Sequence, residues 1–290
     1  MKLLRAFICK SLLSSLLLSP FALPAQPTAQ AALSSALRTT PAAGVVVDIT
    51  SGRQIAAVGA TTRTSTPGSI LKPLFLSTAL ERGEVLPQTT VFCRRDLHIR
   101  TGSREWDLAC THPQRDVAFS AREALAYSCN RYFAGLADRI SPAQVAIILD
   151  HYGLTSGSRP QSLLSQSQEQ KELLVLGVAG IAVSPVQIAG AYRKLALELR
   201  GTQALDAVRD GLMDSVEYGM AHNAGVPGRT ILGKTGTATD PVTGWSHGWF
   251  AGIGFLGHQE VAVVIYLPRG NGADAARLAQ HVFLGAAGMP

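Results

Sequence analysis

A serine and a lysine three residues apart, Ser69 and Lys72, are the first candidates for chemistry in this chain of 290 residues. If both lie on one helix, positions i and i+3 share a face, so the lysine amine can approach the serine hydroxyl. Pro67 and Gly68 predict that the helix begins at the serine, and Pro73 is compatible because proline is tolerated in a first helical turn. An amine acts as a general base only when burial or a neighbouring cation lowers its pKa. The pair therefore predicts a serine nucleophile activated by a lysine.

A second polar group, Ser128 and Asn130, lies between two stretches of helical character, 121–127 and 131–140. Ser128 could pass a proton between Lys72 and a leaving group, as a general acid–base relay requires. Asn130 could bind a substrate amide or position the lysine. Serine and asparagine are also common helix caps, so a purely structural interpretation stays open.

A third group, Lys234, Thr235, Gly236 and Thr237, follows the apolar residues 230–232. A lysine and two hydroxyls can hold a substrate carboxylate. Glycine lacks a side chain, so an extended substrate could lie against the strand at that point. A backbone N–H nearby, with that of the serine nucleophile, could form an oxyanion hole. The structural alternative is an edge strand protected by a lysine.

Two nucleotide-binding patterns also occur, and both lack the context that they need. Residues 228–235 match the P-loop pattern and residues 252–257 match G-x-G-x-x-G. Each motif requires a helix directly after it, because helix N–H groups bind the phosphates. The residues that follow are rich in glycine and threonine in the first case and strand-like in the second. We therefore expect no nucleotide cofactor.

The elements around the polar groups change from strands to helices and back to strands. Residues 44–49 and 54–58 predict a hairpin, and Ser120, Ser141 and Ser184 each predict a helix start with Glu or Gln three residues later. The last third of the chain predicts three strands and a final helix, at residues 230–234, 248–255, 261–267 and 273–284. Because connections within each strand group are short, we expect an α+β fold with a mostly antiparallel sheet.

The N-terminus has the order of a secretory signal: basic residues, an apolar run at 12–18, and then small residues. The run is far shorter than the roughly 20 residues that span a bilayer. Cleavage is expected after Ala25 or Ala31, and an uncleaved N-terminal anchor is the alternative. The protein is thus expected to be exported to the periplasm or another extracytoplasmic space, with three parts: a signal peptide at 1–31, a short N-terminal segment at 32–43 and one domain at 44–290.

The charge balance argues against nucleic acid as a partner. The formal net charge is +6, and three of the positive residues lie in the first ten, within the predicted signal. Without them the chain would carry half that charge, which is too little for a nucleic-acid-binding surface.

Export changes the interpretation of the cysteines. In an oxidising compartment Cys93 and Cys110 can pair, and we expect a disulfide between them that stabilises the fold by roughly 3 kcal/mol. They could instead be buried thiols, or form a zinc site with His98 and His112. That spacing matches no common zinc pattern, so we expect no metal.

Taken together, the three polar groups resemble the S-x-x-K, S-x-N and K-T-G motifs of the penicillin-binding protein transpeptidases and the related serine β-lactamases. The motifs occur in the order of that family, and the middle residue of the second is Cys129. Similar stretches lie between the motifs and on either side of them, at residues 46–48, 51–53, 93–112, 184–189 and 248–252. The resemblance covers the chain from about residue 44 to about residue 285.

The resemblance implies a β-lactamase/transpeptidase-like fold, with a mostly antiparallel sheet flanked by helices and an all-helical insert subdomain. It implies that Ser69 is the acylated nucleophile and that Lys72 is its general base. It also implies that Ser128 and Asn130 complete a proton relay and a substrate clamp.

The same resemblance implies that Lys234, Thr235 and Thr237 hold the terminal carboxylate of the substrate. The expected partners are peptidoglycan stem peptides that end in D-Ala-D-Ala, with β-lactams as their mimics, and peripheral contact with the cell envelope. The expected activity is that of a serine D-Ala-D-Ala transpeptidase or carboxypeptidase, which uses no cofactor.

Two other functions remain open on the same motifs. A serine β-lactamase needs a base that activates water for rapid hydrolysis of the acyl-enzyme, and Glu169 and Glu172 are the only carboxylates between Asp150 and Glu198. Neither has the sequence context of a known β-lactamase base. A non-catalytic module that binds muropeptides or β-lactams is the third interpretation, because a fold alone does not establish a function.

Overall fold

A computed structural model of the protein describes residues 28–114, 116–155, 160–240 and 243–285. The predicted signal peptide therefore lies almost entirely outside the described residues. Within the described part of the chain, no helix is both long enough and apolar enough to cross a membrane.

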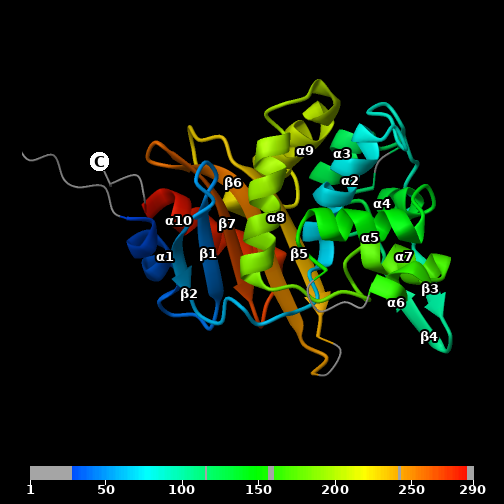
Figure 1. Cartoon of the computed structure of the whole chain (residues 1–290), viewed down its shortest axis with the longest axis horizontal. Helices are drawn as coiled ribbons and strands as arrows, with labels where there is room; N and C mark the ends of the chain where they lie inside the picture. The colour runs from blue at the N-terminus through cyan, green and yellow to red at the C-terminus, as the bar shows by residue number, and fades with distance from the viewer. Residues whose placement is uncertain (1–27, 115, 156–159, 241–242, 286–290) are drawn as a thin grey trace, which may run out of the picture.

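A five-stranded antiparallel sheet forms the centre of the molecule, as the sequence predicts (Figure 1). Its strand order is β2-β1-β7-β6-β5. The strands are β1 (Ala43–Asp48), β2 (Gln54–Val58), β5 (Leu232–Thr239), β6 (Ser246–Leu256) and β7 (Gln259–Leu267). The first hairpin joins the C-terminal strands through β1 and β7, where Ala43 pairs with Tyr266. This order leaves β5, which carries the K-T-G residues, at an edge of the sheet.

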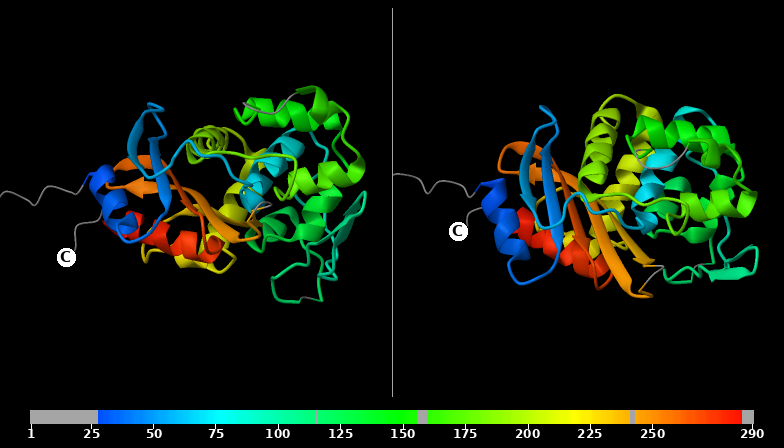
Figure 2. Two further views of the ribbon diagram at one scale, coloured as in Figure 1. Left: turned by 90° about the horizontal axis from the view of Figure 1, so that it is seen from below. Right: turned by 60° about the horizontal axis from the view of Figure 1, so that its bottom comes forward.

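Helices cover both faces of the sheet, as Figure 2 shows. On one face lie α1 (Ala29–Leu37) and α10 (Gly272–Gly285), and on the other lies α8 (Pro185–Glu198). Alternate residues of β1 point to opposite faces of the sheet. Val46 packs in the hydrophobic core beneath α1 and α10, whereas Val45 packs in the core that includes α8. The short N-terminal segment at 32–43, for which the sequence predicts no element, is thus partly helical.

The middle of the chain forms the helical insert, seen in cyan and green in Figure 1. Its helices are α2 (Lys72–Glu81), α3 (Ala121–Ala126), α4 (Asn130–Ala137), α5 (Pro142–His151), α6 (Pro160–Leu164) and α7 (Gln168–Val175). A small ribbon of β3 (His98–Thr101) and β4 (Arg104–Asp107) projects from it. Helix α9 (Asp206–Glu217) follows α8 and packs against both α3 and β5.

The predicted helix starts are confirmed by their hydrogen bonds. Ser120, Ser141 and Ser184 each accept a bond from the backbone three residues later, and each closes a capping box. Ser69 was predicted to begin an α-helix. In the structure it lies in a 3₁₀ turn, Gly68–Leu71, and the α-helix α2 begins directly after this turn. The Lys72 N–H bonds to the Ser69 carbonyl, and Pro73 has no N–H with which to make the α-helical bond to it.

The two rejected nucleotide motifs are also confirmed as chance matches. The P-loop lysine, Lys234, lies inside strand β5, and the G-x-G-x-x-G residues span the end of β6 and its turn into β7. Neither motif is followed by a helix.

Candidate acylation site

The turn that carries Ser69 is held by hydrogen bonds to two other parts of the chain. The Gly68 N–H donates to the Gly177 carbonyl at 2.8 Å, and the Tyr192 hydroxyl donates to the Ile70 carbonyl at 2.9 Å. Gly177 has a positive φ, and a Cβ there would lie only 2.1 Å from the Gly68 carbonyl oxygen. Residues around position 177 therefore set the place of the candidate nucleophile, which is partly exposed.

Lys72 is fully buried beneath this turn, and it points to the second motif. Its amine donates to the Ser128 carbonyl at 2.8 Å, to the Ser128 hydroxyl at 3.2 Å and to the Asn130 side-chain carbonyl at 2.6 Å. Burial lowers the pKa of Lys72 from 10.5 to about 8, against an opposing effect of the nearby Cys129 and Cys110. Among the described residues no carboxylate pairs with this amine. The lysine therefore has the lowered pKa that a general base requires near neutral pH.

The second motif is built around a strained residue. Ser128 has φ +56, in the left-handed region that favours glycine, and this turns both its hydroxyl and its carbonyl toward the Lys72 amine. Asn130 follows as the first residue of α4 and uses its amide twice, accepting from Lys72 and donating to the Leu108 carbonyl at 2.9 Å. Of the two roles that the sequence left open, the geometry supports positioning of the lysine.

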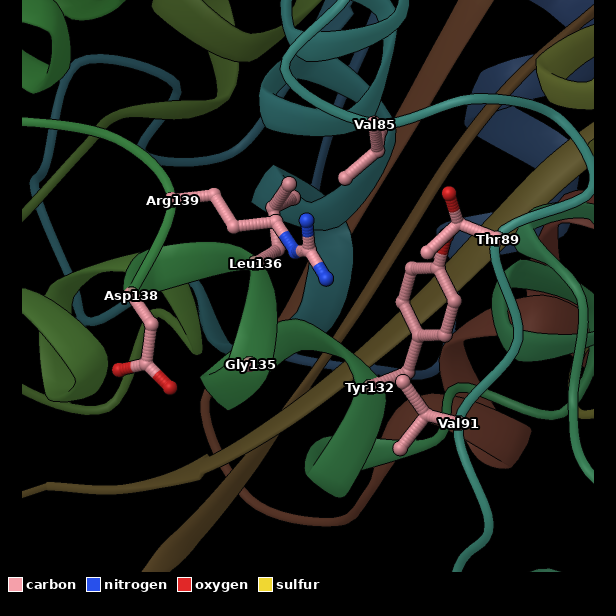
Figure 3. Close-up of a pocket in the computed structure, with 8 residues that line it drawn as sticks. All are labelled: Val85, Thr89, Val91, Tyr132, Gly135, Leu136, Asp138 and Arg139. Carbon is pink, nitrogen blue, oxygen red and sulfur yellow. The ribbon is translucent and has the colours of Figure 1, made fainter.

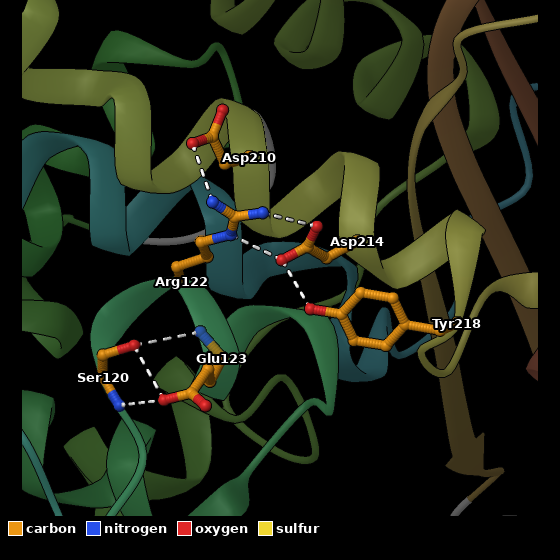
Figure 4. Close-up of polar contacts among 6 residues, drawn as sticks. All are labelled: Ser120, Arg122, Glu123, Asp210, Asp214 and Tyr218. Atoms are coloured by element: carbon orange, nitrogen blue, oxygen red, sulfur yellow. Dashed lines mark hydrogen bonds and ion pairs between the residues drawn. The ribbon is translucent and has the colours of Figure 1, made fainter.

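A polar network fixes the helix that leads into Ser128 (Figure 4). Arg122 of α3 donates to both carboxylate oxygens of Asp214 in α9, at 2.6 and 2.9 Å, and to Asp210 at 3.2 Å. The Tyr218 hydroxyl donates to Asp214 at 2.6 Å. Bidentate charge-assisted bonds of this kind are among the strong polar contacts in proteins. Helix α3 is therefore held against α9, which in turn packs on β5.

Strand β5 lies directly against the Ser69 turn. A Cβ on Gly236 would lie 2.5 Å from the Pro67 carbonyl oxygen, so only glycine permits this approach. A Cβ on Gly68 would lie 2.7 Å from the Thr237 carbonyl oxygen and 3.0 Å from its nitrogen. Gly236 therefore allows the turn that carries Ser69 to pack against β5. The sequence instead predicted that Gly236 would contact an extended substrate. The backbone of Thr237 thus lies against Gly68, the residue before Ser69, and an oxyanion hole made from the N–H groups of Ser69 and Thr237 requires these two segments to be close.

The three side chains expected to hold a carboxylate have different environments. Lys234 is fully buried, and burial, followed by the effect of Lys72, holds its pKa well below the ordinary value. A bound carboxylate would favour the charged form of this amine. The Thr235 hydroxyl donates to the Met220 carbonyl at 3.3 Å. The exposed Thr237 hydroxyl accepts from the Gly272 N–H at 2.9 Å, which leaves its proton free for a ligand.

The eight residues predicted from the sequence therefore come from three separate segments and meet around one turn. Lys72 contacts Ser128 and Asn130, and β5 contacts the turn through Gly236 and Thr237. No hydrogen bond among the described residues joins the hydroxyl of the candidate nucleophile to the lysine. A cavity of about 270 Å³ elsewhere in the insert is lined by none of the eight, so it is not part of this site (Figure 3).

The expected disulfide is not present. Cys93, Cys110 and Cys129 are free and buried, with 3.5 Å between the first two sulfur atoms and 4.0 Å between the last two. A disulfide has an S–S distance of about 2.05 Å. Cys110 lies between the other two sulfur atoms, within hydrogen-bond range of both, and is therefore not committed to Cys93. His98, one of the two histidines of the alternative zinc spacing, lies exposed on the ribbon, with its Nδ1 3.9 Å from Asp107 Oδ1.

A family model described as the penicillin binding protein transpeptidase domain matches residues 41–284 of the chain. Among curated proteins, no sequence is significantly similar to it.

Solved structures with this fold include the transpeptidase domain of penicillin-binding protein 3 from Burkholderia pseudomallei. It has a TM-score of 0.72 at 19% identity, over 90% of this chain and 94% of that one. The D,D-transpeptidase domain of a peptidoglycan glycosyltransferase from Eggerthella lenta gives a TM-score of 0.72 at 19% identity, over 89% and 80% of the two chains. A Mycobacterium penicillin-binding protein 3 complexed with aztreonam gives 0.69 at 18% identity, over 88% and 75%. At these identities the likeness concerns the fold.

Proposed function

We propose that peptidoglycan stem peptides ending in D-Ala-D-Ala acylate Ser69 of this chain. The chain belongs to the penicillin-binding protein transpeptidase domain family, and the proposal starts from that membership. The observation that carries the proposal is the environment of Lys72. This lysine is fully buried, has a pKa of about 8 and is bound to the second motif, beneath the turn that presents the serine. The acceptor of the acyl group, an amine or water, defines a transpeptidase or a carboxypeptidase.

The chemistry follows from the arrangement. Neutral Lys72 accepts the proton of Ser69 as the hydroxyl oxygen attacks the penultimate D-Ala carbonyl. The developing oxyanion receives hydrogen bonds from the N–H groups of Ser69 and Thr237. The proton then passes by way of the Ser128 hydroxyl, which Lys72 contacts at 3.2 Å, to the leaving D-Ala amine. Lys234, which is buried beside the site, provides the positive charge for the terminal carboxylate.

A fast β-lactamase is less well supported, because, among the described residues, the hydrogen bonds of both candidate carboxylates are with residues at the start of α7 and with none of the eight site residues. The exposed Glu169 accepts from the Ser167 hydroxyl at 2.8 Å, at the start of α7. Glu172 accepts from Gln168 at 3.1 Å on the same helix. If neither carboxylate activates water, an acyl-enzyme formed from a penicillin should persist.

Intact-mass spectrometry of the protein mixed with a penicillin tests this function. We expect the mass of one penicillin to be added at Ser69 and retained for many minutes, with no adduct on Ser69→Ala. Ser103→Ala, at an exposed turn of the ribbon, is the matched control and should label normally. Rapid turnover of penicillin would favour the β-lactamase function, and absence of any adduct would favour a binding module.

Export remains part of the proposal, and helix α1 bears on the cleavage site. The Gln30 side chain bonds twice to the backbone of Ala57 in β2, at 3.0 and 3.2 Å. Cleavage after Ala31 would remove this residue and the first turn of α1, whereas cleavage after Ala25 keeps both. We therefore favour cleavage after Ala25. N-terminal sequencing of protein from the cell envelope would check this site, and a chain that begins at Ala32 would contradict it.

A further inference from the structure

We propose that Cys93, Cys110, His112 and Cys129 form a tetrahedral zinc site that holds the second motif in position. One ligand atom from each of these residues lies within 4.8 Å of the others, and each residue is at most 3% exposed. The cluster forms where the segment before β3, the segment after β4 and the start of α4 meet. Three sulfur ligands and one imidazole are a ligand set typical of structural zinc.

The spacing of the sulfur atoms fits a metal better than a disulfide. With Zn–S bonds of about 2.3 Å, two sulfurs of a tetrahedral site lie about 3.8 Å apart. The distances of 3.5 Å between Cys93 and Cys110 and 4.0 Å between Cys110 and Cys129 lie on either side of that value. Small side-chain rotations would therefore suffice to place an ion between the three sulfurs.

The orientation of His112 provides an independent argument. Its Nδ1 lies 2.8 Å from the Pro113 carbonyl oxygen, which can only accept, so Nδ1 carries the proton. The other nitrogen, Nε2, then has a lone pair, and it is buried with no hydrogen-bond partner. A buried lone pair within 4.8 Å of three sulfurs is the arrangement of a metal-binding histidine whose second nitrogen is oriented by a carbonyl.

Backbone groups around the cluster are already directed at the sulfurs. The Asn130 N–H donates to Cys110 at 3.1 Å, and the Arg95 N–H donates to Cys93 at 3.4 Å. Such N–H···S bonds stabilise thiolates in zinc sites. On binding, Zn²⁺ would displace the thiol protons to solvent, so the ion balances charge that this buried cluster could not hold alone.

The site connects directly to the acylation centre. Cys129 lies between Ser128 and Asn130, the two residues that bind the Lys72 amine. Coordination of Cys129 would therefore fix the left-handed backbone of Ser128 and the amide of Asn130. The proposal replaces the sequence-based expectation of no metal with a structural zinc ion. This ion would support the second motif and take no part in the acyl transfer.

Metal analysis of the full chain tests the proposal. The protein, purified without chelators or reconstituted with zinc sulfate under reducing conditions, should contain equimolar zinc. Cobalt substitution of the wild-type protein should give the intense visible bands of tetrahedral Co²⁺ together with thiolate charge-transfer absorption. Cys93→Ser and His112→Gln should weaken zinc binding by more than the roughly 10–100-fold that loss of an outer-shell partner causes.

The matched control is His98→Gln, which should keep equimolar zinc. Failure of the wild-type protein to bind equimolar zinc, six-coordinate cobalt spectra, or equal loss in His98→Gln and His112→Gln would overturn the site. A Cys93–Cys110 disulfide in zinc-free exported protein would also overturn it. A second measurement compares penicillin acylation with and without zinc. This measurement rests on the proposed function, whereas the zinc content does not, and an unchanged rate would refute only the supporting role.

Discussion

Gly177→Ala tests whether a residue far from the motifs in sequence sets the position of the nucleophile. Two costs add at this position. Alanine at φ +72 is strained by roughly 1–2 kcal/mol. Its Cβ would also lie 2.1 Å from the Gly68 carbonyl oxygen, so the turn would have to move by about 1 Å at a further cost of roughly 1–3 kcal/mol.

The expected result has two parts. The free energy of unfolding should fall by about 3 kcal/mol, which lowers Tm by roughly 10 °C in a domain of this size. The rate of penicillin acylation should fall by about 100-fold, because a displacement of about 1 Å can misalign a nucleophile to that extent. Thermal unfolding and stopped-flow labelling with a fluorescent penicillin measure the two effects.

Gly83→Ala is the matched control, because Gly83 has nearly the same φ of +71, but a Cβ at this position would meet nothing within 4 Å. It should lose only the roughly 1–2 kcal/mol of backbone strain and acylate at the wild-type rate. If the two variants have the same stability and the same rate, the contact between Gly177 and Gly68 does not position the nucleophile.

Three further predictions concern the lysine and its supports. Lys72→Arg should lower acylation by 10²–10⁴-fold in the same assay, because a guanidinium does not deprotonate, and an undiminished rate would remove Lys72 from the mechanism. Since only the neutral amine accepts a proton and its pKa is about 8, the wild-type rate should rise about tenfold per unit below pH 8 and level off above it; a flat profile would contradict this. Arg122→Ala should destabilise by about 2 kcal/mol in urea unfolding, because it leaves the Asp214 carboxylate buried without its partner. Arg100→Ala, which breaks the exposed pair with Glu105, should cost under about 1 kcal/mol, and equal losses would refute the role of the buried pair.

Features encoded by neighbouring residues were predictable from the sequence. The helix starts at Ser141 and Ser184 depend on contacts over three residues, and the hairpin of β1 and β2 depends on its turn. The order of the strands depends on pairing between residues more than 200 positions apart, such as Ala43 with Tyr266. No local pattern specifies such pairing, so the complete architecture came from the family resemblance.

The candidate site was likewise predictable from the sequence only in part. The spacing of Ser69 and Lys72 indicated an activated serine, but it could not show that the lysine binds the second motif, nor that Gly177 supports the turn. Cys129, the third thiol of the proposed zinc site, was interpreted only as the middle residue of a motif. A third cysteine 19 positions after Cys110 was the available signal, and only the fold brings the two sulfurs together.

The left-handed backbone of Ser128 places stability and catalysis in conflict at one position. Glycine adopts φ +56 without strain, so Ser128→Gly would relieve roughly 1–2 kcal/mol of backbone strain, which exceeds the roughly 0.4–1 kcal/mol that the greater freedom of glycine in the unfolded chain costs. The same change would remove the hydroxyl that Lys72 contacts. A lineage that no longer needed acyl transfer could accept glycine here and gain stability, whereas one that depends on the reaction must keep the strained serine. The identity of this residue in related chains would therefore distinguish active members from those that have become binding proteins.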